Sequence, residues 1–153
     1  MNNNKIISYE GLFFENDSLT LIHSLDTEKL EKANDEIHCT FRYHPNNDEI
    51  FNEIVGQTFD IYLIAYGNDG MNSGFLVSLP DELKPYYINY EDDRKTLRTP
   101  HITASLSKKS IPSNTKDLDF KLFSEPIKIK GRFGFCIKDN RGKYISFDKF
   151  DIK

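Results

Sequence analysis

The chain has 153 residues, the size of one domain, and we expect residues 1–153 to fold around a single core. Its 20 basic and 24 acidic residues give a net charge of −4, so it lacks the basic excess with which proteins bind duplex DNA. A small anion held by a few local donors is still compatible with this charge. The sequence has neither an apolar run of membrane-spanning length nor the apolar core of a signal peptide, so we expect no membrane partner.

Short alternating runs rich in Phe, Tyr, Ile and Val predict a mostly β chain. Turn signals at Asn68-Asp69-Gly70 and Asn140-Arg141-Gly142 indicate two hairpins, because Asn and Gly tolerate positive φ angles. In chain order, the predicted strands are residues 5–14, 37–43, 58–66, 73–79, 101–106, 118–123, 127–137 and 143–147.

Helical signals are fewer. Asp17 is the expected cap of a first short helix, and the apolar spacing of Ile50, Phe51 and Ile54 indicates a buried helical stripe further along. The predicted helices are residues 18–25, 27–33 and 48–55, and the predicted loops are residues 85–100 and 107–117.

The two cysteines, Cys39 and Cys136, lie far apart and form no Cys-x-x-Cys pair. This spacing indicates neither a thiolate metal cluster nor a disulfide framework. We therefore expect a reducing, cytoplasmic location, with Cys39 packed in the core as a small hydrophobic residue.

Two pentads share one pattern: Ile37-His38-Cys39-Thr40-Phe41 and Pro100-His101-Ile102-Thr103-Ala104. Residues two apart on a strand point to the same face, so each predicted strand has an apolar face and a face carrying His and Thr. By the same alternation, Arg42 is expected to continue the first polar face, and Ser105 the second.

If the two strands lie close together, two imidazoles and two hydroxyls converge on a volume the size of a phosphate. Cleavage of a cyclic phosphodiester uses such a set. One neutral imidazole takes a proton from water and one imidazolium protonates the departing ribose oxygen, because the pKa of His lies near neutrality. The hydroxyls of Thr40 and Thr103 are expected to hold the non-bridging oxygens. This chemistry needs no metal and no cofactor.

The two pentads resemble the paired signature of the two-histidine phosphoesterase superfamily, which includes bacterial RNA ligase-like cyclic phosphodiesterases and the cyclic phosphodiesterase domain of plant tRNA ligases. The run Gly131-Arg132-Phe133-Gly134 after the second motif is similar to the family's layout. The resemblance implies a bilobed α+β fold, mostly antiparallel β with few short helices. It also implies metal-independent hydrolysis, with His38 and His101 as acid and base in an order left open.

Further substrate contacts are expected from side chains near the motifs. Aromatic rings stack on nucleobases, and Tyr9 and Tyr43 lie on or next to the first motif strand. Arg42, Ser105 and the loop residue Arg98 are expected to meet a phosphate or ribose, whereas His23 and His44 lie outside both motifs and are interpreted as structural.

The sequence favours a phosphodiesterase acting on a small nucleotide-like substrate, such as a 2′,3′-cyclic phosphate at an RNA end or a cyclic oligonucleotide signal. One alternative is a non-catalytic module that binds a phosphorylated ligand in the same cleft. A zinc site built on the two histidines is a second alternative, but neither His has a third ligand at strand spacing. The substrate and the oligomeric state stay open.

Overall fold

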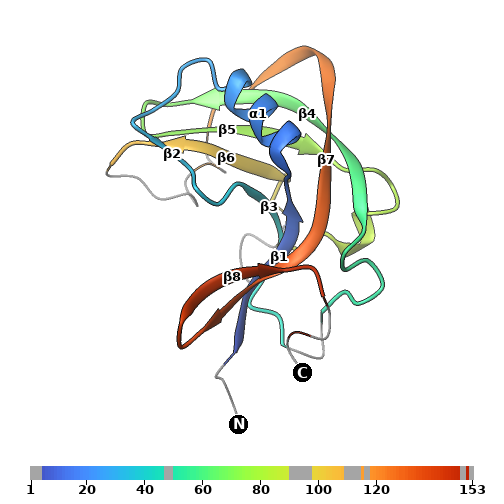
Figure 1. Ribbon diagram of the computed structural model, residues 1–153. Helices are drawn as coiled ribbons and strands as arrows, with labels where there is room; N and C mark the ends of the chain where they lie inside the picture. The colour runs from blue at the N-terminus through green and yellow to red at the C-terminus, as the bar shows by residue number, and fades with distance from the viewer. Residues whose placement is uncertain are drawn as a thin grey trace.

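The computed structural model describes residues 5–46, 50–89, 98–108, 115, 118–148 and 151. These residues form an α+β fold dominated by an eight-stranded antiparallel sheet (Figure 1). The order of strands across the sheet is β2-β6-β5-β4-β7-β1-β3, and β8 pairs with β7. The strands are β1 (Ile6–Phe13), β2 (Lys32–Ala33), β3 (His38–Tyr43), β4 (Thr58–Asn68), β5 (Asn72–Ser78), β6 (His101–Leu106), β7 (Lys121–Asp139) and β8 (Gly142–Ser146).

The predicted strands are confirmed, with one correction. The two strands expected at residues 118–123 and 127–137 are a single strand, β7. Where β7 pairs with β4, Leu63 lies opposite Ile127 but Ala65 lies opposite Leu122, so the residues of β7 between Leu122 and Ile127 form an irregular stretch. Pro126 lies in that stretch, where its missing N–H breaks no ladder hydrogen bond. Both predicted hairpin turns are confirmed, joining β4 to β5 and β7 to β8.

Only the first predicted helix is confirmed in the described part of the chain, as α1 (Asn16–Leu25). Its N-cap is Glu15, so the expected cap at Asp17 is wrong; Asp17 lies in the first turn, where a carboxylate suits the helix dipole. The helix expected at residues 27–33 is also wrong, because Lys32–Ala33 form the edge strand β2 against β6.

The helix expected at residues 48–55 is replaced by turns over residues 52–56, although residues 47–49 lie outside the described part. The turns end at Gly56, whose φ of 86° suits glycine and ends any helical path.

The predicted loop at 85–100 begins with a 3-10 turn, η1 (Lys84–Tyr86), and its residues 90–97 are not described. Most of the predicted loop at 107–117 is likewise not described.

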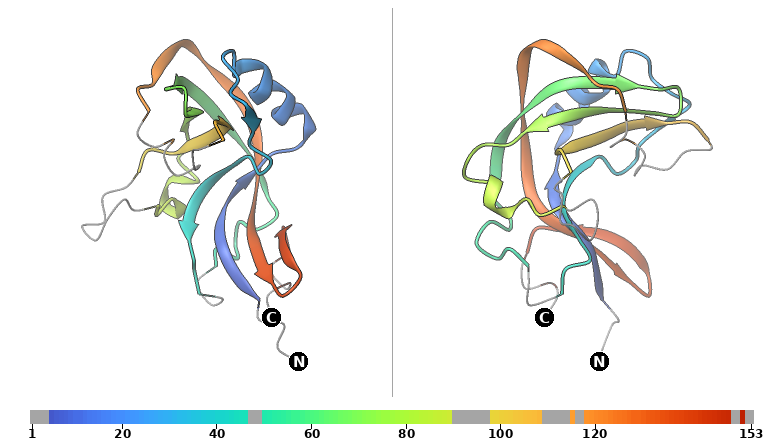
Figure 2. Two further views of the ribbon diagram at one scale, coloured as in Figure 1. Left: turned by 90° about the vertical axis from the view of Figure 1, so that its left-hand side faces the viewer. Right: turned by 180° about the vertical axis from the view of Figure 1, so that it is seen from behind.

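The sheet is strongly bent about its central pair, β4 and β7 (Figures 1 and 2). β5, β6 and β2 extend from β4, whereas β1 and β3 extend from β7, so the sheet has two halves. Four strands separate β3 from β6 in the sheet order, yet the bend brings these two strands into contact. The segment after β2 bridges them, with the Asn34 N–H donating to Ala104 O at 2.9 Å.

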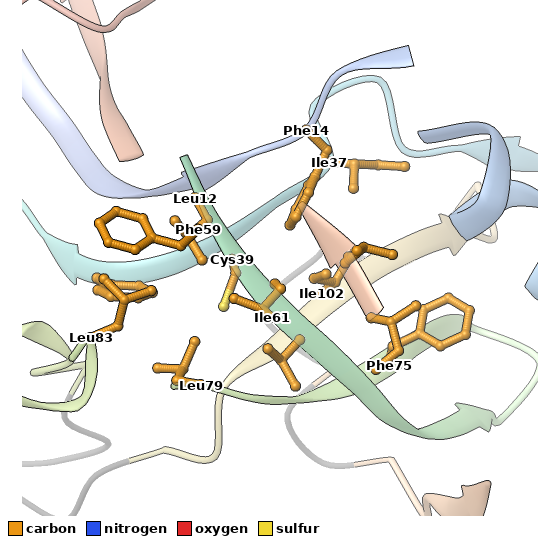
Figure 3. Packing of buried hydrophobic residues seen from close by; sticks show 14 of the residues in the cluster. Leu12, Phe14, Ile37, Cys39, Phe59, Ile61, Phe75, Leu79, Leu83 and Ile102 are labelled. Carbon is orange, nitrogen blue, oxygen red and sulfur yellow. The ribbon is translucent and has the colours of Figure 1, made fainter. Parts of the chain in front are cut away.

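The main core fills the space enclosed by the two halves of the bent sheet and α1. Side chains from both halves contribute to this one cluster, including Leu12, Cys39, Ile61, Phe75 and Ile102 (Figure 3). Among the described residues, no helix is long and apolar enough to cross a membrane.

Candidate active site

The two histidine–threonine motifs lie on β3 and β6, the strands that the bend brings together. Cys39 and Phe41 from the first motif and Ile102 and Ala104 from the second are buried in the main core cluster. Strand alternation therefore directs the histidines and threonines away from that cluster. This confirms the predicted division of each motif into an apolar and a polar face.

Both imidazoles are oriented by the same kind of hydrogen bond. His38 Nδ1 lies 2.6 Å from Glu36 O, and His101 Nδ1 lies 2.9 Å from Thr99 O. A carbonyl oxygen only accepts, so each Nδ1 carries a proton and donates to the backbone two residues earlier. In a neutral ring protonated at Nδ1, Nε2 is the nitrogen that accepts a proton, which is the tautomer that a general base needs.

The two rings are close enough to influence one another. The positive charge of a protonated His101 lowers the pKa of His38. The backbone N–H of His101 lies near the Cys39 thiol and lowers its pKa, so the two motif strands are neighbours at this point too. Burial nevertheless raises the pKa of the Cys39 thiol to about 12, so Cys39 acts as a core residue and not as a nucleophile.

Aromatic side chains enclose the ring of His38. Tyr9 stacks on it with ring centroids 4.3 Å apart, and Phe13 lies 6.1 Å away. The Tyr9 hydroxyl donates to the Glu36 carboxylate, whose charge raises the pKa of His38. Burial acts in the opposite direction and is stronger, so the pKa of His38 lies below its ordinary value of 6.5. His38 is therefore predominantly neutral at neutral pH.

Each motif threonine lies opposite a glycine on the neighbouring strand. Thr40 on β3 pairs with Gly11, and Thr103 on β6 pairs with Gly74. A Cβ on Gly11 would lie 2.1 Å from Cys39 O, and one on Gly74 would lie 2.4 Å from Ile102 O. The close approach of both motif strands therefore requires glycine.

The glycine pattern continues one strand further in both halves. Gly11 faces Gly134 on β7, and Gly74 faces Gly67 on β4. The same three-strand row, Gly-Gly-Thr, thus occurs in each half of the sheet. The sequence analysis cited Gly134 only as part of the family's layout and assigned none of these glycines a role in strand packing, although their positions inside alternating strands were an available signal.

Both motif strands contain a β-bulge directly after the threonine. The β1–β3 register skips Phe41 and the β5–β6 register skips Ala104. A bulge puts one extra residue in a strand and reverses the side-chain alternation beyond it. The expected placement of Arg42 and Ser105 on the polar faces is therefore wrong.

Arg42 instead forms an ion pair with the fully buried Glu10, with Nε 2.9 Å from Oε2, and its guanidinium lies 4.2 Å from the centre of the Phe51 ring. Ser105 donates to Asp26 Oδ2 at 2.7 Å, and its Oγ lies 2.6 Å from Ser73 Oγ. Both side chains thus stabilise the fold on the side opposite the histidines.

Tyr43 takes the position that alternation alone assigns to Arg42. It is 44 % exposed and its ring centroid is 6.4 Å from that of Tyr9, so both tyrosines lie on the side of His38.

The two motif threonines, Thr40 and Thr103, are both buried. Thr103 Oγ1 is 2.6 Å from Thr115 Oγ1.

Arg98 lies beside a residue that the sequence prediction missed, Asn89. The Arg98 N–H donates to Asn89 O at 2.9 Å, and Asn89 Nδ2 reaches Thr40 O at 3.4 Å. Within the described chain, Tyr87 Oη, Asn89 Oδ1 and Arg98 Nε are buried and have no hydrogen-bond partner. Tyr87 contacts Phe41 and Asn89 contacts Thr40, so these unsatisfied polar atoms belong to residues that pack against the first motif strand.

Comparison with models of protein families gives no match for this chain, and comparison with curated proteins gives none either. In the part of the chain that the structure describes, no group of three or more His, Cys, Asp or Glu side chains is arranged to hold a metal ion.

Proposed function

We propose that the protein is a metal-independent phosphodiesterase of the two-histidine type, acting on a 2′,3′-cyclic or related nucleotide phosphodiester. The observation that carries the proposal is the repeated geometry of the two motifs. Each has a histidine tethered through Nδ1 to the carbonyl two residues earlier, and a threonine opposite a glycine. The bilobed fold of that superfamily is part of the proposal, and the two-half sheet supports it.

The environment of His38 supports its assignment as the general base. Its pKa is lowered, so at neutral pH Nε2 is free to accept a proton from the attacking water. The water oxygen forms a bond to phosphorus as that proton moves to His38. Protonated His101 donates its Nε2 proton to the ribose oxygen as the bond from phosphorus to that oxygen breaks. The products are a phosphomonoester and a free hydroxyl.

Thr40 and Thr103 are assigned to the non-bridging phosphate oxygens. Hydroxyl donors aimed at those oxygens stabilise the negative charge that develops in the transition state. Tyr43 is the exposed ring available for stacking on a base. Arg98 and Asn89 supply buried polar atoms beside Thr40.

We place the proposed reaction in the cytoplasm. Cys39 and Cys136 are both buried and free, as expected of a protein from a reducing compartment.

Turnover of nucleoside 2′,3′-cyclic phosphates in the presence of a chelator tests the proposal. We expect wild-type turnover to persist with the chelator, and His38→Ala and His101→Ala each to lower it at least about a hundredfold, the usual contribution of a positioned acid or base. His23→Gln, on α1 and outside both motifs, is the matched control and should leave the rate unchanged.

Wild-type rates in both active-site variants would contradict the catalytic assignment. Tight nucleotide binding without turnover would favour a non-catalytic binding module, and complete loss of turnover with the chelator would favour a metal site.

A further inference from the structure

Asn34 directly follows the edge strand β2 and lies between the two motifs. Its backbone N–H donates to Ala104 O at 2.9 Å, which continues the pairing of β2 with β6 by one residue. Its side-chain Nδ2 donates to Thr103 O, also at 2.9 Å. The second motif strand is therefore bound to Asn34 at two consecutive carbonyls, one of which belongs to the motif threonine.

The same side chain also contacts the residue that orients His38. Asn34 Oδ1 accepts from the Glu36 N–H at 3.2 Å, and Asn34 Nδ2 lies 3.4 Å from Glu36 O. That carbonyl oxygen accepts the His38 Nδ1 proton at 2.6 Å. Asn34 thus holds residue 36 on both sides of its Cα, which limits rotation of the carbonyl that selects the tautomer of His38.

We propose that Asn34 is a positioning residue that couples the two motifs, because its one amide group binds both the backbone of Thr103 and the carbonyl that orients His38. The inference rests on the proposed function, in which the two motifs act as one site. Asn34 acts through two backbone oxygens and is therefore not a catalytic residue. Misplacement of a catalytic group by about 1 Å costs about a hundredfold in rate, so a side chain that fixes this separation matters to catalysis.

The imidazole of His38 reports on this arrangement without any turnover. The Glu36 carbonyl favours the charged ring, because it accepts the Nδ1 proton. Asn34 contacts the same oxygen, so a charge placed at position 34 would lie close to the imidazole. The other charged and titratable groups that act on His38 are Tyr9 on β1, the Glu36 carboxylate, His101 on β6 and Lys143 on β8, with the Cys136 thiol of β7 beside that carboxylate.

The test records the tautomer and the pKa of His38, by NMR of the ring nitrogens, in wild type and two variants. In Asn34→Ala the tether loosens, so the proton of the neutral ring should move partly from Nδ1 to Nε2 and the pKa should fall further. Asn34→Asp keeps an acceptor for the Glu36 N–H and adds a carboxylate, so the pKa of His38 should rise by about one pH unit. Asn52→Ala and Asn52→Asp, at an exposed turn, are the matched controls and should change neither readout.

Opposite shifts in the two variants distinguish positioning from a purely structural role. Loosening that only admits water would weaken burial, the largest influence on His38, and would raise its pKa in both variants. An upward shift in Asn34→Ala, or unchanged values in both variants, would overturn the inference.

Hydrogen exchange of the wild-type protein tests the same contacts without requiring a variant to fold. The side-chain amide protons of Asn34 should exchange with solvent at least about tenfold more slowly than those of exposed Asn52, because they are bound to backbone oxygens. Equal exchange at the two side chains would contradict the proposed coupling.

Turnover separates this inference from the proposed function. With a nucleoside 2′,3′-cyclic phosphate, Asn34→Ala should lower kcat about ten- to hundredfold, and by much less in a His38→Ala background, because the two residues act as a unit. Equal losses in both backgrounds would mean that Asn34 does not act through His38. If the cyclic phosphate is not hydrolysed at all, the proposed function fails, and the NMR and exchange results still decide the role of Asn34.

Discussion

The imidazole of His38 lies between two opposing influences on its protonation. Burial against Tyr9 and Phe13 favours the neutral ring, whereas the backbone carbonyl and the carboxylate of Glu36 favour the charged ring. Burial has the larger effect, so the pKa is lowered. A base with a lowered pKa keeps its free nitrogen as the pH falls, which favours His38 for accepting the proton of water.

This balance predicts the position of the acid limb in the pH profile of kcat/KM. Because the base is active when neutral and its pKa lies below 6.5, activity should be retained below pH 6.5 and then decline. Glu36→Gln removes a negative charge that favours imidazolium, so it should move the acid limb to still lower pH. Asp35→Asn, an exposed neighbour, is the control. An acid limb above pH 6.5, or an upward shift in Glu36→Gln, would contradict the assignment of His38 as base.

At the level of the elements, the two motif strands depend on their glycine neighbours. Gly11 and Gly74 lie where any Cβ would meet a backbone carbonyl of the adjacent strand. A backbone atom moves less easily than the end of a side chain, so substitution there displaces the strand that carries the histidine and the threonine.

We expect Gly11→Ala and Gly74→Ala each to lower the free energy of unfolding by about 1–3 kcal/mol, the usual cost of overpacking, and to lower turnover as well. Urea denaturation measures the first effect. Gly131→Ala is the comparison, because its Cβ would lie 3.0 Å from the side chain of Leu12 and should cost less. Equal stability of all three variants and the wild type would argue against the close approach of β3 and β6 to their neighbours.

The elements also show which features a sequence can predict. Alternation along residues 37–41 and 100–104 was enough to separate buried Cys39 and Ile102 from the motif histidines. It failed beyond the threonines, because a bulge depends on the register with the next strand, which is not visible in one strand's sequence. Arg42 and Ser105 were misplaced for that reason. The helix expected at residues 27–33 failed because tertiary pairing with β6 outweighed a weak local preference.

At the scale of the whole molecule, the bend of the sheet brings the two motifs together. Four strands lie between β3 and β6 in the sheet. In the sequence, His101 follows His38 by 63 residues (101 − 38). A pattern of strands does not determine how far a sheet curls, because curvature comes from accumulated twist and bulges. The resemblance between the pentads led to the prediction that the motifs meet, and the contact between β3 and β6 supports it.

The shared environment of the two imidazoles is tested most directly by following the ring nitrogens of all four histidines by NMR during titration with a nucleoside 2′-monophosphate, the expected kind of product. We predict that the signals of His38 and His101 shift together with one dissociation constant, while those of His23 and His44 stay in place. Thr103→Val should weaken binding at both rings equally. A response from only one of the two rings, or two different dissociation constants, would contradict a common phosphate site.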